Sequence, residues 1–350
     1  MLDPVKRTAP FFGDDPRFRR FVLLLALATA VPMIAVPFTR GEHRDTTAML
    51  SLASLLGFLG GPGHVSLTTW FYADPLARNH FLANPVRYVL APLVLIVGTT
   101  LAYVVWQERE PTRWINFFFT VWLLWHYQRQ NWGVHSFVTR VTSDEPASRL
   151  EGWILKTAVV GGVIGGIHSA EFGAGTAIAA YAPVAFRVGA AVTMTLPVLI
   201  GVAVATTPGL RSAPLRLCTL FVAAGFFLPV FLFDDPGNAV LTYGLAHGLQ
   251  YAVFMTYVAR ASGLPGAAPG SPGRPGLMML AACLLVVGAF LYKGNDYGLM
   301  QKWNLLPVFG LVLGVTMAHF VIDAGIWRLR DDFPRRYVGA AFPFLSRRKG

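Results

Sequence analysis

The stretch Val315–Asp332, VTMAHFVIDAGIWRLRDD, places two ionisable side chains inside an apolar segment. His319 and Asp323 are four residues apart, so on a helix their side chains lie on the same face. Ionisable groups inside a membrane-spanning helix are costly and usually face the interior of the bundle, where they serve a function. The stretch therefore predicts a buried polar site within a membrane helix.

The composition of the whole chain is typical of a polytopic membrane protein. Of its 350 residues, 54% are hydrophobic and only 13% are charged, and the mean hydropathy is +0.51, outside the range of soluble domains. The formal net charge of +11 fits membrane topology better than nucleic-acid binding, so we expect no nucleic-acid partner. Cys218 and Cys283 lie in separate apolar runs without the spacing of a metal or haem motif, and we interpret them as core residues.

Apolar runs that could cross a hydrocarbon core of about 30 Å predict an all-α bundle of about ten transmembrane helices, with eight to ten as the range. The runs cover residues 20–39, 46–72, 85–106, 114–138, 153–179, 183–206, 214–233, 237–259, 277–293 and 303–327. The first run is longer than the apolar core of a signal peptide, so we interpret it as a retained span.

Lys and Arg are concentrated in alternate connections between these runs, which sets the expected topology. The positive-inside rule then places both termini in the cytoplasm, in agreement with an even number of spans. We expect one transmembrane domain over residues 1–350, in a bacterial inner (plasma) membrane. It would have a cytoplasmic N-terminal segment (1–19), a Gly/Pro-rich cytoplasmic linker (262–276) and a basic cytoplasmic tail (329–350).

Histidine is the polar residue that stands out in the predicted spans. Of the eight histidines in the chain, those within spans or at their ends are His64, His126, His135, His168, His247 and His319. Neutral imidazole is a ligand for iron, copper and zinc, so this set predicts a metal site. Because about 100° separates successive helical residues, His126 and His135 point to opposite sides unless the helix breaks at Gly133, and we favour His126. His43 and His80, in loops, are interpreted as solvated.

Three further side chains accompany these histidines and are candidate catalytic residues. Glu171 follows His168 by three residues, and Asp323 follows His319 by four. Tyr251 lies on the same helical stripe as His247. A carboxylate in such a position either ligates the metal itself or accepts the second N–H of a ligating imidazole.

Four or five histidines with one or two carboxylates favour non-haem iron, in a mononuclear or dinuclear centre, with copper or zinc as alternative metals. The absence of clustered thiolates argues against an iron–sulfur cluster. Two other functions remain open: a b-type haem protein with two histidine axial ligands, and a proton- or metal-coupled transporter with His–Asp and His–Glu relays. Hydrogen-bonded helix packing without any ligand is the structural alternative.

The distribution of histidines over several helices, together with the GPGH turn that ends at His64, resembles the polytopic, histidine-rich membrane oxygenases, most nearly the bacterial β-carotene-cleaving dioxygenases. This resemblance implies an iron ion held by histidines from several helices and an oxidative reaction. The closely spaced histidine boxes of membrane desaturases and alkane hydroxylases are missing, which speaks against desaturase chemistry. The strings HGLQY and HFVIDAGIW also resemble parts of a bacterial membrane family that carries no assigned activity.

From these observations we expect a metal-dependent membrane oxidoreductase. The chain has no sizeable soluble segment that could hold a polar substrate, so we expect a lipid-like or isoprenoid substrate that enters from the bilayer. The expected partners are therefore the lipid bilayer, this hydrophobic small molecule and, for reactions that consume electrons, an electron-donor protein.

Overall fold

The computed structural model describes residues 15–39, 54–107, 109–143, 145–167, 177–233, 236–261 and 274–345. Over these ranges the chain is almost entirely helical and contains no β-strand. The predicted all-α class is therefore confirmed. His43, His168 and Glu171, most of the 1–19 segment and of the 262–276 linker, and the last residues of the tail lie outside the described residues.

The longer elements begin and end as follows: α1 Pro16–Thr39, α5 Pro75–Ala83, α6 Ala91–Trp106, α7 Glu110–Thr142, α8 Arg149–Gly166, α10 Ala182–Met194, α11 Leu196–Thr206, α13 Pro214–Ala224, α15 Pro236–Ala261, α16 Arg274–Ala282, α19 Leu306–Ile326 and α20 Asp332–Ala340. Shorter elements connect them: η2 Leu59–Gly63, α3 His64–Leu67, α4 Trp70–Ala73, η3 Val86–Leu90, η4 Ala177–Tyr181, α12 Pro208–Arg211, η5 Gly225–Phe227, α14 Pro229–Leu232, η6 Cys283–Val287, α17 Gly288–Gly294, α18 Tyr297–Lys302 and η7 Pro343–Leu345.

Within the described ranges, five helical segments are long and apolar enough to cross a membrane. They are Pro16–Val36, Val86–Trp106, Ala177–Thr206, Pro275–Gly294 and Leu306–Ile326. This agrees with a membrane protein, but the number is lower than the expected ten.

The difference has a physical reason in the remaining helices. Helices α7 and α15 have 33 and 26 residues and are long enough, but each carries many polar side chains. Helix α8 ends at Gly166 and contains three charged residues in 18, and the run predicted over 214–233 is divided into α13, η5 and α14. Segments of this kind form helices, but they are too polar or too short to qualify as membrane spans by their length and hydropathy.

Proline marks several of the helix starts and breaks. The Pro197 ring lies at the first turn of α11, where the missing N–H costs no hydrogen bond, and α10 ends just before it. Helix α8 starts with a capping box, in which Ser148 accepts from the Glu151 N–H and the Glu151 carboxylate accepts from the Ser148 N–H. These local signals fix where the polar side chains of α7 and α8 lie relative to each other.

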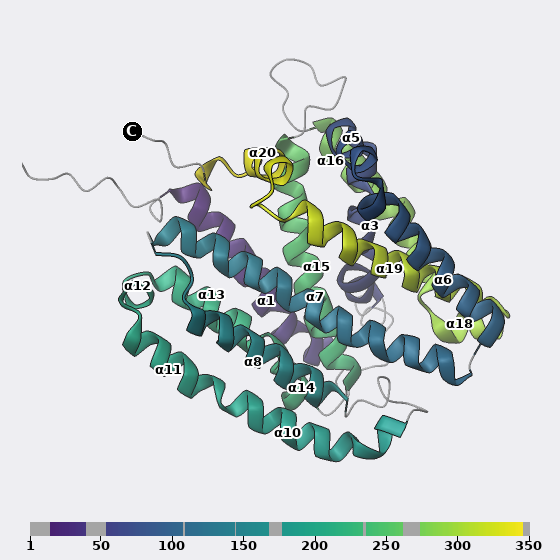
Figure 1. Cartoon of the computed structure of the whole chain (residues 1–350), viewed down its shortest axis with the longest axis horizontal. Coiled ribbons are helices and arrows are strands. Elements are labelled where there is room, and N and C mark those ends of the chain that lie inside the picture. Colours follow the sequence, from purple (N-terminus) through teal and green to yellow (C-terminus); the bar gives the residue numbers. More distant parts are fainter. Residues whose placement is uncertain are drawn as a thin grey trace, which may run out of the picture.

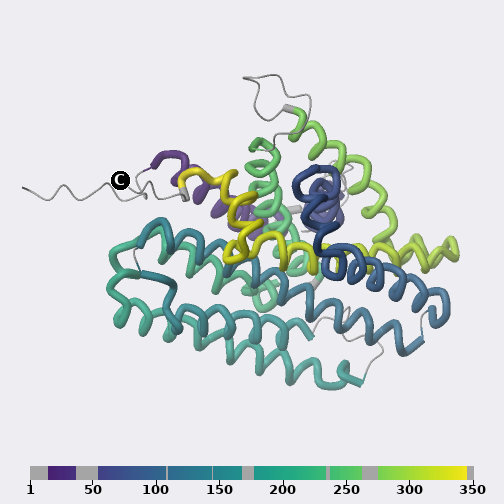
Figure 2. Tube along the Cα trace, turned by 45° about the horizontal axis from the view of Figure 1, so that its top comes forward, coloured from purple at the N-terminus to yellow at the C-terminus, as the bar shows by residue number. Residues whose placement is uncertain are grey.

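The long helices are arranged in two parts that meet at α7 and α15. Helices α7, α8, α10, α11 and α13 run side by side and form a layer, as Figures 1 and 2 show. Helix α15 passes across this layer and contacts α1 and η2. On the other side, α19 packs along α6. The site described next lies where α3, α7, α15 and α19 come together.

An aromatic cluster packs next to this junction and ties α1 to the C-terminal part of the chain. The Phe21 ring has centroid distances of 5.3 Å to Phe254 and 5.5 Å to both Phe137 and Phe342. All four side chains are buried, and aromatic contacts of this length contribute about 0.5–1.5 kcal/mol each beyond the area that they bury. This packing holds α7 and α15 in place on one side of the site.

Candidate metal centre

Four of the predicted histidines converge from four separate elements. His64 begins α3, His126 lies in α7, His247 in α15 and His319 in α19. The distances between neighbouring ring centroids are 4.7 Å for His64–His247, 5.0 Å for His126–His247 and 5.1 Å for both His64–His319 and His126–His319. None of the four residues is more than 8% exposed. The sequence-based expectation that these side chains share one interior therefore agrees with the structure.

The nitrogen atoms of these rings are within reach of a common ligand. One nitrogen from each of His64, His247 and His319 lies within 4.8 Å of the other two, and His126, His319 and Asp323 form a second such set. Among the described residues, both ring nitrogens of His64 and His247 are buried without a hydrogen-bond partner, as is Nε2 of His126 and of His319. An unsatisfied buried polar group costs about 1–3 kcal/mol. A metal ion that accepts these lone pairs would remove that cost, so the residues fit such an ion.

Close backbone packing at Gly60 of η2 and Gly248 of α15 brings His64 and His247 together. A Cβ atom added to Gly60 would lie 2.6 Å from the Leu245 nitrogen, and one added to Gly248 would lie 2.4 Å from the Leu59 carbonyl oxygen. The π-helical turn η2, which contains Pro62, ends directly before His64. Such turns occur frequently at functional sites. The lack of a side chain at Gly60 and Gly248 is therefore what allows the two segments to approach this closely.

A chain of hydrogen bonds runs from His319 to Asp323 through two hydroxyl groups. Thr68 Oγ1 lies 2.6 Å from His319 Nδ1 and 2.8 Å from the Tyr251 hydroxyl. Tyr251 in turn donates to Asp323 Oδ1 at 3.0 Å. Oδ1 of the same carboxylate lies 3.6 Å from His319 Nδ1. Helix α19 therefore places His319 and Asp323, the two ends of this series of hydrogen bonds, on one face, as their four-residue spacing predicts.

The direction of this chain follows from what each group can donate. An ionised Asp323 carboxylate can only accept, so the single proton of Tyr251 goes to it, and the Tyr251 oxygen is left to accept from Thr68. The Thr68 oxygen then accepts from Nδ1–H of His319. With Asp323 ionised, His319 is held as the Nδ1–H tautomer, and the lone pair on Nε2 is free for a ligand. Such outer partners commonly fix the orientation of a ligating histidine.

Aromatic rings close the site on the side of α7. The Phe320 ring stacks on His126 with centroids 4.4 Å apart, and Trp122 packs against Phe320 at 5.4 Å. The Tyr127 ring lies 4.3 Å from His247. Asp323 Oδ2 approaches His126 Nε2 at 3.9 Å. The cluster is therefore walled off from water by apolar surfaces, with one carboxylate as its only nearby acid in the described part of the chain.

His135 belongs to a different buried network. Helix α7 continues without a break through Gly133, so His135 points away from His126 and does not join the cluster. Its Nε2 lies 2.8 Å from Glu151 Oε2, and its Nδ1 lies 3.0 Å from Thr219 Oγ1. Arg216 donates to both carboxylate oxygens of Glu151, at 3.0 and 2.6 Å. These side chains are almost completely buried and join α7, α8 and α13.

Sequence reasoning missed part of both networks. The Thr68 hydroxyl, which no prediction from the sequence included, contacts His319 and Tyr251. Arg216, which no sequence motif singled out, is fully buried and donates to the Glu151 carboxylate. Both pairings connect residues that are far apart in the chain. The one signal in the sequence is that Thr68 follows His64 by four residues, which places the two side chains on the same helical face.

Comparisons with protein-family models, curated proteins and solved structures found no match. A function for the site therefore has to follow from the groups that form it, which are four buried imidazoles, a carboxylate, a phenol and a threonine hydroxyl. His168 and Glu171, which were expected to contribute, lie outside the described residues.

Proposed function

We propose that His64, His126, His247 and His319 hold a redox-active metal ion, with Asp323 as a further ligand or as the group that orients His319. One observation carries this proposal. The four rings converge from separate helices, while six of their nitrogen atoms are buried without a hydrogen-bond partner in the part of the chain that the structure describes. Helix packing alone would not require such unpaired groups, because histidines that only join helices do so by hydrogen bonds.

Non-haem iron is the metal that this set of groups favours. Imidazole nitrogens combined with one carboxylate, and with positions left open, are typical ligands of iron in oxygenases. The two sets of potential ligands share His319, and the Nδ1 atom of that ring is already occupied by Thr68. Since His319 has a single free nitrogen, one ion is favoured over two.

The geometry is less suited to a haem. Two axial imidazoles would have to lie on opposite faces of a porphyrin plane. Here the neighbouring rings of His64 and His247 contact each other edge to face at 4.7 Å, so no macrocycle fits between them. This favours a bare metal ion over the b-type cytochrome alternative.

We propose further that the protein oxidises a lipid-like or isoprenoid substrate in a bacterial inner membrane, with both termini in the cytoplasm. When bound, the metal would activate O₂ for reaction with this substrate. Cleavage of a carbon–carbon double bond consumes both oxygen atoms and needs no further electrons, whereas hydroxylation needs two electrons from a donor protein. Phe320 and Trp122 would exclude water from the reacting groups, and Tyr251 with Asp323 would hold a proton beside them.

Elemental analysis of protein purified without chelators tests the metal site. Wild-type protein should contain close to one metal ion per chain. His247→Ala and His319→Ala should lose it while keeping their helical circular-dichroism spectrum, and His80→Ala, outside the cluster, should retain it. Metal-free wild-type protein, or full occupancy in His247→Ala, would overturn the proposal.

Comparison of lipid extracts tests the reaction. Cells that express wild-type protein should contain an oxidised membrane lipid that is missing from cells expressing His319→Ala. Identical lipid profiles from protein that does bind metal would refute the oxidative role but leave the metal site intact.

A further inference from the structure

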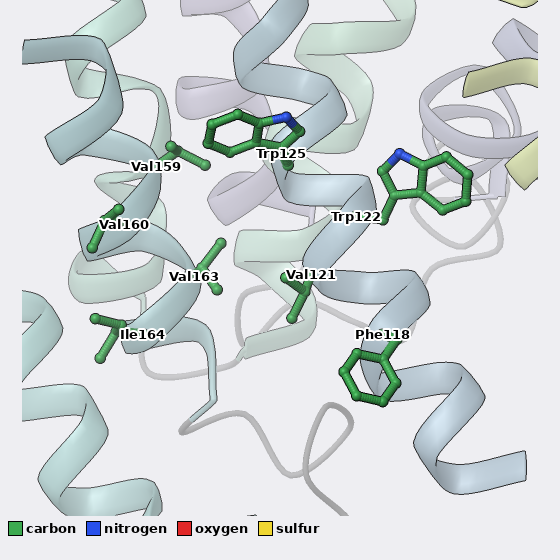
Figure 3. Close-up of a pocket in the computed structure, with 8 residues that line it drawn as sticks. All are labelled: Phe118, Val121, Trp122, Trp125, Val159, Val160, Val163 and Ile164. Carbon is green, nitrogen blue, oxygen red and sulfur yellow. The ribbon is translucent and has the colours of Figure 1, made fainter. Parts of the chain in front are cut away.

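A groove on the outside of the bundle runs between α7 and α8. It has a volume of about 360 Å³, and its lining is almost entirely apolar. Figure 3 shows Phe118, Val121 and Trp125 along α7, and Val159 and Val163 of α8 projecting toward that helix. Phe118, Trp125 and Val160 are 62%, 44% and 46% exposed. Large apolar side chains that remain exposed in contiguous patches mark contact with lipid or with another apolar partner.

Beyond Trp125 and Val159, the groove continues into a smaller hollow that is bordered by two cations. These are Arg129 of α7 and Lys156 of α8. The Lys156 ammonium lies 4.6 Å from the centre of the Trp153 ring, and the Arg129 guanidinium lies 6.0 Å from that of Trp132. Both cations are exposed, and in the described part of the chain neither has a carboxylate partner.

Cations on a membrane-facing surface need an anionic or polar partner at the same depth. Arg129 lies well inside α7, and the tryptophans beside it and beside Lys156 are typical of the headgroup level of a bilayer. An apolar groove that leads to two unpaired cations is complementary to one class of molecule, an amphiphile with a hydrocarbon chain and an anionic head. The bilayer supplies such molecules in the form of anionic phospholipids.

We propose that the α7–α8 groove binds an anionic phospholipid, with one acyl chain along the apolar part and the phosphate at Arg129 and Lys156. This binding does not depend on the metal. The groove nevertheless lies close to the histidines, because Trp122, which also lines it, packs on Phe320 and Phe320 stacks on His126. A bound chain is therefore separated from the cluster by one layer of aromatic rings.

Quenching of tryptophan fluorescence by brominated lipids tests this proposal. The full-length protein is placed in phosphatidylcholine nanodiscs that contain either brominated phosphatidylglycerol or brominated phosphatidylcholine. The anionic lipid should quench wild-type protein more strongly at equal mole fraction. Arg129→Gln/Lys156→Gln should weaken this preferential binding by about 30-fold, since each of the two cations contributes a factor of roughly five to six to anionic-lipid affinity. Metal content should stay unchanged in this variant.

Arg140→Gln/Arg149→Gln is the matched control, because it removes two exposed cations from the same helices outside the groove. It should keep the preference for the anionic lipid. Val163→Phe, which fills the apolar part without changing any charge, should reduce quenching by both lipids. Equal quenching of wild-type protein by the two lipids, or the same loss in the control as in the groove variant, would overturn the proposal.

Discussion

Thr68 provides the sharpest test of how the histidine cluster is organised. Its hydroxyl is the only described contact of His319 Nδ1 shorter than 3 Å and also connects Tyr251 to that ring. Thr68→Val removes the hydroxyl and keeps the size and β-branched shape of the side chain. We expect the variant to fold and to bind metal more weakly, because His319 is then free to rotate or to change tautomer.

The magnitude follows from the groups that lose their partner. His319 is 1% exposed, so water cannot replace Thr68, and one unsatisfied buried polar group destabilises the folded state by about 1–3 kcal/mol. Tyr251 keeps its bond to Asp323 and adds little. For metal affinity, loss of a group that orients a ligating histidine typically costs about 10–100-fold, which corresponds to about 1.4–2.8 kcal/mol.

The assay is a competition titration of purified protein against a chelator of known affinity, with bound metal measured after each step. Thr68→Ser, which keeps the hydroxyl, is the matched control and should bind within a few-fold of wild type. If Thr68→Val and Thr68→Ser bind metal equally well, the hydrogen-bond chain does not hold His319, and the assignment of its free nitrogen is wrong.

Three further variants test other parts of the structure. Gly248→Ala, whose Cβ would lie 2.4 Å from a facing carbonyl oxygen, should separate two helices and lower metal occupancy in elemental analysis, whereas Gly133→Ala, with nothing within 4 Å, should not. Glu151→Gln should lower the free energy of unfolding by about 3–5 kcal/mol in a denaturant titration, because it leaves a buried arginine unpaired, with no effect on metal in the folded fraction. Burial lowers the pKa of His80 below its ordinary 6.5. The contribution of His80 to stability is therefore present above pH 6.5 and falls as the pH drops below that value, because the folded state binds the proton less readily than the unfolded state. His80→Phe should remove this part of the pH dependence of the thermal midpoint.

Much of the fold and part of the site could be predicted from periodicity. Apolar runs predict where helices form, and the four-residue spacing of His319 and Asp323 correctly predicts that they share a face, with Nδ1 and Oδ1 3.6 Å apart. Fewer helices than expected qualify as spans in the described part of the chain, because a run in which polar side chains point inward still has enough apolar residues to resemble a span. Helix α7, with His126 and Asn131 buried on the same helix, is such a case.

The periodicity of one helix does not reveal which other helix packs against its buried face. Thr68 shares a face with His64, but the partner of its hydroxyl is set by how α19 crosses α3, and α19 is positioned by the close approach of its Gly310 and Gly314 to α6. The same limit applies to His80, which was expected to be solvated. Its ring stacks on Phe333 at 4.0 Å, a contact between residues more than two hundred positions apart.

The two buried histidine networks differ in a way that separates a structural role from a ligand-binding one. His135 has a partner at each nitrogen, and Glu151 has a partner at each oxygen, so that network satisfies itself and needs no further group. In the part of the chain that the structure describes, His64 and His247 have no hydrogen-bond partner at either ring nitrogen, although they are about as buried as His135. Burial without internal satisfaction is stable only when something else supplies the bonds. For four imidazoles in an apolar enclosure, a metal ion is the simplest group that does so.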